Sequence, residues 1–239
     1  MSDHYDELKG MVLSGAGFTS PFRPYVGSAY EEAEHPRSMF CGKATNGWHD
    51  GDYTGPDWSE GEAEWAKAFI DDSIKPKTFD SAFWRFITDT GSRLLELDDA
   101  TTPSGDDRMT LLDKIIWTNV AKIGGRTGNL PDNFMSSYKD IFERMLTEEL
   151  LAHDPDVLIL TTGWYGYEAW WPALEKWTKQ DPEDWLEESD LNGVVRRHVP
   201  DFGKQVWVLR HPQYWAHKHR DAAINAIVDA NRARAVTGG

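Results

Sequence analysis

Four short apolar runs, each followed by a polar loop, constrain the fold of this chain more than any other feature. The runs are 39–41, 115–119, 157–160 and 206–209, and the loops after them carry glycine, polar and aromatic residues. Short apolar runs bounded by turn residues are typical of strands buried on both faces of a parallel sheet. In open α/β sheets, ligands bind beyond the carboxyl ends of the strands. We therefore expect the four strand ends to converge on one pocket.

Helical patterns separate these runs and complete an α/β arrangement. Strands are predicted at 38–42, 114–119, 157–160 and 205–209, and helices at 62–70, 81–97, 132–153, 167–179 and 218–235. Within 81–97, Phe83, Phe86 and Ile87 recur at the spacing of one buried helix face. The alternation predicts a single domain, residues 1–239, with a central four-stranded parallel sheet and helices on both of its faces.

Two segments are expected to lie outside this central arrangement. Residues 1–37 are predicted to form an N-terminal adapter segment, in which 26–34 runs briefly as a helix that is capped at Ser28. Residues 182–203 lack a clear apolar period and are predicted to be irregular.

Composition narrows the class of protein. The chain of 239 residues is long enough for one large α/β domain with a full core. Its single cysteine, Cys41, excludes an intrachain disulfide framework and a zinc or iron–sulfur site built from cysteines, which fits a cytoplasmic protein. The N-terminus has no signal-peptide pattern and no run is long enough to span a membrane.

Charge is unevenly distributed along the chain. The net charge of −15 argues against a protein that coats nucleic acid non-specifically and favours a small-molecule or protein partner. Residues 141–190 hold 13 acidic side chains against 3 Lys or Arg, whereas 191–220 hold 6 Lys or Arg against one acid, Asp201. The basic stretch surrounds the fourth strand end. It is either ordinary surface variation or a rim that contacts phosphates.

Two side chains at strand ends are candidates for ligand chemistry. Asn119 ends the second strand, where its amide could read one edge of a base or simply cap a turn. His211 follows the last strand, where its imidazole could donate a hydrogen bond to an oxygen that gains charge in a transition state, or serve only as a structural histidine.

The loop after the first strand offers further polar groups. Asn46, His49, Asp50 and Asp52 could place a water molecule, or they could form a solvated turn. We expect no metal, because the loop lacks the paired histidine spacing of metal sites. The chain also contains no phosphate-binding glycine motif and no G-x-S-x-G nucleophile elbow.

Four motifs in order resemble those of the uracil-DNA glycosylase superfamily over roughly residues 22–235. They are Phe40-Cys-Gly-Lys-Ala-Thr45, Ile115-Ile-Trp-Thr-Asn-Val-Ala-Lys122, Leu160-Thr-Thr-Gly-Trp164 and Arg210-His-Pro-Gln-Tyr-Trp215. The resemblance implies that Asn119 reads a flipped-out base and that His211 stabilises negative charge on the departing base. It also implies that the residues after His211 form a loop that enters the minor groove of DNA.

The first motif departs from the family pattern. Many members have Asp or Asn two residues after the motif-one glycine, whereas this chain has Ala44, as one branch of the superfamily does. Asn46 or Asp50 would then guide water to the sugar. The glycine- and tryptophan-rich loop 47–60 also departs from the uracil-specific pattern and could enlarge the pocket.

The resemblance assigns roles to a larger set of residues. Trp48 or Tyr53 would stack on the base. The expected substrate-binding residues are Gly42, Lys43, Ala44, Trp48, Tyr53, Asn119, Gly163 and Trp164. The expected DNA-binding residues are Lys122, Arg126, Arg210, Gln213, Tyr214, Trp215 and Lys218. No cofactor is implied, and the cysteines of the iron–sulfur branches are absent.

The expected function is therefore that of a monomeric, monofunctional DNA glycosylase. It would remove uracil or, more in keeping with the altered first motif, a modified pyrimidine such as those of phage DNA in antiviral defence. Two alternatives remain open. The chain could be a non-catalytic module that binds a nucleobase, nucleotide or protein, as Ala44 and the net acidity would favour, or it could hydrolyse free nucleosides or nucleotides.

Overall fold

The structure is a computed structural model, and it describes a little over half of the chain. The described residues are 22–32, 36–43, 81–96, 110–124, 132–162, 170–181, 187–190, 194–199, 203–212, 215 and 217–237. The helix predicted at 62–70 and most of the adapter segment lie outside these residues.

A parallel sheet of four buried strands forms the centre of the fold. The strands are β2 (Ser38–Gly42), β3 (Ile115–Asn119), β4 (Val157–Leu160) and β7 (Lys204–Leu209). They pair in the order β3-β2-β4-β7, and every neighbouring pair is parallel. All residues of these strands are buried, as expected for a sheet covered on both faces. The four predicted parallel strands are confirmed.

The sheet is wider than predicted, because antiparallel strands extend both of its edges. The described strands make a seven-stranded sheet in the order β1-β3-β2-β4-β7-β6-β5. β5 (Glu187–Asp190) and β6 (Val194–Val199) form an antiparallel ladder, and β6 pairs antiparallel with β7. The prediction that 182–203 is irregular is therefore wrong. Charged residues dominate these strands and hide the strand pattern, although the register sets Glu188 opposite Arg197.

The other edge corrects the predicted helix at 26–34. Val26 belongs to the two-residue strand β1 (Tyr25–Val26), which pairs antiparallel with β3. The backbone N–H of Gly27 donates to the Ile115 carbonyl at 3.0 Å, and that of Ala29 donates to the Asp113 carbonyl at 2.7 Å. Residues 28–32 then form turns and a bend rather than a helix. Part of the adapter segment is thus built into the sheet.

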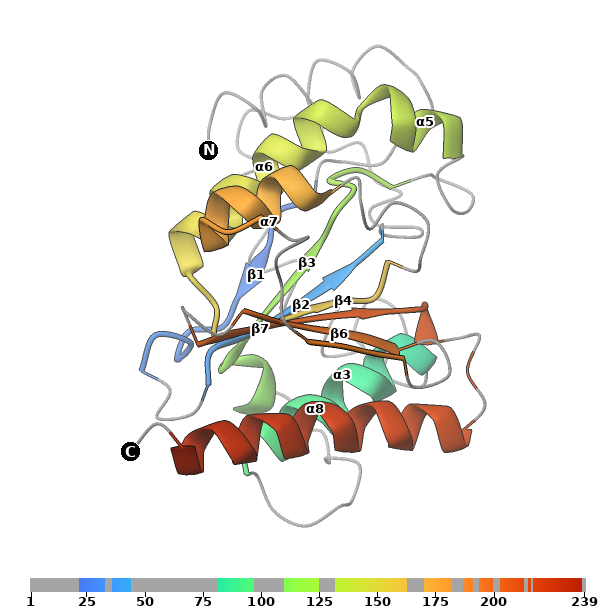
Figure 1. Cartoon of the computed structure of the whole chain (residues 1–239). Helices are drawn as coiled ribbons and strands as arrows, with labels where there is room; N and C mark the ends of the chain where they lie inside the picture. Colours follow the sequence, from blue (N-terminus) through green and yellow to red (C-terminus); the bar gives the residue numbers. More distant parts are fainter. Residues whose placement is uncertain are drawn as a thin grey trace.

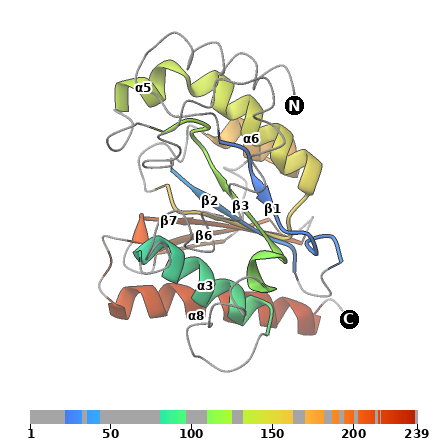
Figure 2. The ribbon, with the colours of Figure 1, turned by 180° about the vertical axis from the view of Figure 1, so that it is seen from behind.

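Helices cover both faces of the sheet, as predicted (Figure 1). On one face lie α5 (Asp132–Ser137), α6 (Lys139–His153) and α7 (Trp171–Thr178), and on the other lie α3 (Ala82–Leu94) and α8 (His217–Thr237). The view from behind shows the same two layers (Figure 2). The predicted helix at 132–153 is two helices that are interrupted at Tyr138.

Each helical layer packs on its own apolar cluster. Residues of α6 and α7, including Phe142 and Leu174, pack with Met39, Cys41 and Leu160. Side chains of successive strand residues point to opposite faces of the sheet. Residues of α3 and α8, including Phe86 and Ile227, pack with the strand side chains on the other face. The sheet therefore carries a core on both sides.

The strand order determines where a ligand site is expected. β2 lies between β3 and β4, so the chain winds outward from β2 in one direction and from β4 in the other. At such a switch point the connecting loops leave opposite sides of the sheet and open a crevice at the carboxyl ends of the strands. Gly42 and Leu160 end the two central strands there.

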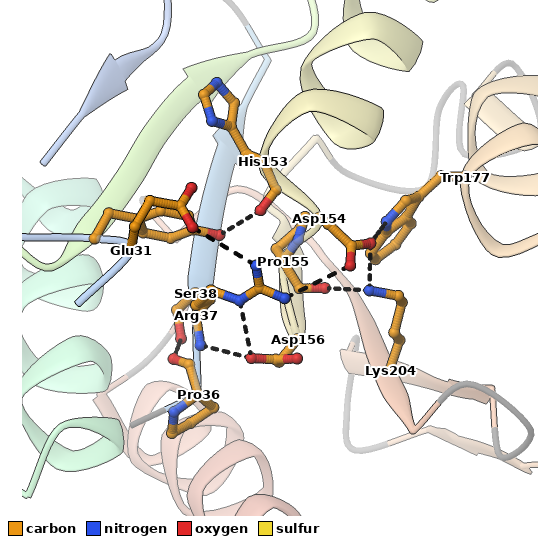
Figure 3. Close-up of polar contacts among 11 residues, drawn as sticks. Glu31, Pro36, Arg37, Ser38, His153, Asp154, Pro155, Asp156, Trp177 and Lys204 are labelled. Carbon is orange, nitrogen blue, oxygen red and sulfur yellow. Dashed lines mark hydrogen bonds and ion pairs between the residues drawn. The ribbon is translucent and has the colours of Figure 1, made fainter. Parts of the chain in front are cut away.

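The amino edge of the sheet, at the opposite end, is occupied by a network of ion pairs (Figure 3). Arg37 Nε lies 3.5 Å from Asp156 Oδ2, and its other guanidinium nitrogens lie 3.6 Å from Asp154 and 3.8 Å from Glu31. Lys204 Nζ lies 2.5 Å from Asp154 Oδ1, which also accepts a hydrogen bond from Trp177. This amino-edge network joins the segments that precede β2 and β4 to the first residue of β7. The network does not extend to the carboxyl edge, where a ligand site is expected.

Candidate functional site

The structure describes only part of the predicted site. The described residues among the candidates are Gly42, Lys43, Asn119, Lys122, Arg210, His211, Trp215 and, by its backbone, Lys218. The candidates that lie outside the described residues are Ala44, Asn46, Trp48, Asp50, Tyr53, Arg126, Gly163, Trp164, Gln213 and Tyr214. Their predicted roles stay predictions.

Gly42 and Asn119 lie side by side at the carboxyl edge, because β2 and β3 pair in a register that sets them opposite each other. The ladder continues beyond the strands, where the N–H groups of Val120 and Ala121 donate to the carbonyls of Gly42 and Lys43, each at 2.9 Å. A methyl group on Gly42 would overlap Asn119 Oδ1. Glycine is needed at this position so that the Asn119 amide can lie against the backbone of β2.

The Asn119 amide is buried, and no described residue uses its donor. The residue is 2% exposed, and its Nδ2 has no hydrogen-bond partner among the described residues. A buried donor that loses its partner destabilises a fold by about 1–3 kcal/mol. An amide in this state at the carboxyl edge can donate a hydrogen bond to an acceptor that arrives from outside.

Phe83 connects this amide to His211. Its ring stacks on the imidazole with centroids 6.0 Å apart and planes 15° apart, and its Cζ lies 3.4 Å from the position of a methyl group on Gly42. Asn119, Gly42, Phe83 and His211 therefore form a continuous row along the edge. The helical spacing predicts only that Phe83 lies on the buried face of a helix, and no sequence signal distinguishes it from Phe86.

The position of Phe83 follows from the start of α3. Ser81 caps the helix, since its hydroxyl accepts a hydrogen bond from the Trp84 N–H at 3.3 Å. The cap fixes Phe83 in the first turn, where it remains half-buried, while Trp84 and Phe86 enter the core.

His211 lies in an environment that favours its neutral form. Burial lowers the pKa of His211 below its ordinary value of 6.5, and the nearby positive charge of Lys43 lowers it further. The neutral imidazole carries one N–H donor and one acceptor nitrogen. It can therefore donate a hydrogen bond to an oxygen without first taking up a proton.

Replacing Lys43 with Met is expected to raise the pKa of His211, because a positive charge that opposes imidazole protonation is removed. NMR titration of the imidazole Cε1–H measures this change directly. Since the folded-state pKa lies below that of the unfolded chain, unfolding takes up a proton and stability falls as the pH drops below about 6.5. This acid sensitivity should weaken in Lys43→Met. A pKa that is unchanged or lower in the variant would contradict the assignment.

The structure changes the interpretation of two residues that were predicted to contact DNA. Lys122 is wholly buried, and its Nζ lies 2.6 Å from Glu149 Oε2, so its predicted contact with DNA is wrong. Trp215 packs edge-on against Phe86, with centroids 5.3 Å apart, and is half-buried. Its ring anchors the loop after His211 to α3. Arg210, by contrast, is exposed beside His211.

Comparisons with known proteins add no assignment: no protein-family model matches this chain, and no curated protein matches its sequence. In the part of the chain that the structure describes, no three His, Cys, Asp or Glu side chains gather as ligands of a metal ion would. Every helix that could be searched there is too short or too polar to cross a membrane.

Proposed function

We propose that the chain is a monofunctional DNA glycosylase that takes a flipped-out pyrimidine at the carboxyl edge of β2, β3 and β7. The observation that carries this proposal is the buried Asn119 amide, whose donor has no partner among the described residues and which lies in one row with Phe83 and His211. A planar base offers carbonyl oxygens that match a buried amide donor and a neutral imidazole. The ordered motifs of the sequence give the proposal its reaction class.

The proposed chemistry needs only side chains of this chain and water. Asn119 donates its Nδ2–H to a carbonyl oxygen of the base, and neutral His211 donates an N–H to the oxygen that gains charge. The bond between C1′ and the base nitrogen breaks with its electron pair leaving on the base. Water, guided by Asn46 or Asp50, adds its hydroxide to C1′ and gives its proton to the base. The products are a free base and an abasic site.

The proposed substrate is uracil or, more specifically, a modified pyrimidine such as those in phage DNA, which would suit an antiviral enzyme. Ala44 and the loop 47–60 support this choice, since their sequences depart from the first motif and from the uracil-specific pattern. We further propose that the monomer contacts the DNA backbone through the basic stretch around β7, in which exposed Arg210 lies next to the site.

The test is to incubate the protein with uracil-containing duplexes, duplexes carrying a panel of modified pyrimidines, and modified phage DNA. Released bases are identified by mass spectrometry, and abasic sites are detected by alkaline cleavage. At least one substrate should yield a free base, and His211→Ala prepared in the same way should yield none. If no DNA in the panel loses a base, or if His211→Ala releases as much as the parent, the proposal fails.

A non-catalytic nucleobase-binding module is the second candidate, and two observations favour it. Ala44 carries no group that can activate water, and the net charge of −15 weakens general DNA affinity. This candidate expects base-dependent binding through Asn119 that persists over long incubation while the DNA stays intact. Isothermal titration with free bases and nucleotides, run beside the release assay, separates the two functions.

A further inference from the structure

Three charged and polar side chains form a closed network directly behind the end of β3. Lys122 Nζ lies 2.6 Å from Glu149 Oε2 and 2.7 Å from Thr118 Oγ1, and the Thr118 hydroxyl donates to the same Glu149 oxygen at 2.8 Å. Lys122 and Thr118 are 0% exposed and Glu149 is 1% exposed. We call these three residues the strand-end network.

The strand-end network is a poor device for stability alone. An ion pair in a dry interior loses the hydration of both charges, and well-packed apolar residues of similar volume serve the fold equally well or better. Glu149 Oε1 is buried and has no partner among the described residues, so the pair is also incompletely satisfied. The surrounding core of α6 and the sheet is apolar and could accommodate such a replacement.

The position of the network connects it to Asn119. Thr118 precedes Asn119 in β3, and side chains alternate between the faces of a strand, so Thr118 faces α6 while Asn119 lies against Gly42 on the route to Phe83. Lys122 closes the turn that follows Asn119. Asn119 is therefore bracketed on both sides by residues that bind one Glu149 oxygen.

The backbone of the same turn is tied to two other segments. The carbonyl of Lys122 accepts a hydrogen bond from the Phe22 N–H at 2.5 Å, and the N–H groups of Val120 and Ala121 bind the chain after β2. The turn cannot shift without breaking either these bonds or the buried ion pair. The ion pair is the part of this arrangement that reaches across to a helix, α6.

We propose that Lys122 and Glu149 are positioning residues that hold Asn119 in a single orientation for its ligand. This inference rests on the proposed function, in which Asn119 reads the base. It assigns a role to a buried lysine that makes no contact with DNA. It also accounts for an ion pair retained where an apolar pair would fill the same space.

The test separates positioning from stability by using a double variant, Lys122→Met with Glu149→Leu. Because both charges are removed together, the double variant should fold with a stability near that of the parent. The readout is the side-chain NH₂ signal of Asn119 in a ¹⁵N-correlated NMR spectrum, which Asn119→Ala identifies by its disappearance. The parent should give one sharp pair of peaks, and the double variant a broadened or multiple set.

Two further variants keep the test decisive. Thr118→Val removes one link of the network with little change of shape and should perturb the same signal to a lesser degree. Lys204→Met removes a largely buried ammonium group from the amino-edge network, which lies at the opposite end of the sheet, and should leave the Asn119 signal unchanged. An Asn119 signal that is as sharp in the double variant as in the parent overturns the inference.

Base release gives an independent readout where the parent is active. The double variant should lose at least tenfold in kcat, because the amide adopts the productive orientation only part of the time. Full activity in the double variant at parental stability would also overturn the inference. If the parent releases no base, the proposed function fails, while the NMR comparison still decides whether Lys122 and Glu149 position Asn119.

Discussion

Asn119→Ala is expected to abolish most base release while leaving the protein as stable as the parent or more stable. The loss should be about 10²–10³-fold in kcat/KM, the size seen when one preorganised hydrogen-bond donor is removed from an active site. The stability should not fall, because the substitution removes a buried Nδ2 that has no partner among the described residues. Binding sites commonly combine lost function with retained or increased stability in this way.

The measurement pairs single-turnover base release with urea denaturation of the same preparations. Asn225→Ala is the matched control, since Asn225 is an exposed asparagine on α8 that accepts a hydrogen bond from Arg93 at 2.6 Å. It should leave base release unchanged. An Asn119→Ala protein that keeps full activity, or one that unfolds at much lower urea concentration than the parent, would show that Asn119 is a structural residue.

Lys122→Met is expected to cause the largest loss of stability among the single variants considered, about 3–5 kcal/mol. The variant leaves the Glu149 carboxylate in a dry core, where the Thr118 hydroxyl is the one donor that remains to it among the described residues. A buried charge without its counter-charge must either remain ionised at high cost or take up a proton on folding. The size of the loss reflects this stranded charge rather than the net contribution of the ion pair.

Urea titration at pH 7 measures the effect, and two comparisons interpret it. Adding Glu149→Leu to Lys122→Met should recover most of the lost stability, because no buried charge remains. Lys204→Met should lose less, since Asp154 keeps Arg37 at 3.6 Å and has a side chain that is 53% exposed and can be hydrated. A loss below about 1 kcal/mol in Lys122→Met would contradict the assignment of Lys122 and Glu149 as a dry, buried ion pair.

The central sheet could be predicted because each of its four strands contains a short apolar run and is buried on both faces. The start and end of β2 and β4 agree with the predicted residues 38–42 and 157–160. Helices on both faces follow from the alternation of these runs with longer periodic segments. A local sequence pattern is enough to predict an element that is buried in the way its apolar residues indicate.

Other features depend on partners that are distant in sequence. The β5–β6 hairpin has a charged composition, so only its pairing with β7 identifies it as part of the sheet. Lys122 looks like a surface lysine until Glu149, on α6, is placed beside it. Phe83 becomes a site residue only because the cap of α3 directs it toward His211. Tertiary context overrides residue type in all three cases.

The strand order also dictates the order in which the chain can fold as it is synthesised. β2 is made first among the parallel strands but lies between β3 and β4, so neither of its neighbours exists when it leaves the ribosome. At about 5–20 residues per second, several seconds pass before Asn119 emerges and gives Gly42 its partner. During this interval Met39, Phe40 and Cys41 form an unpaired apolar edge. Nascent chains halted before β3 should therefore be the species that chaperones bind or that aggregate.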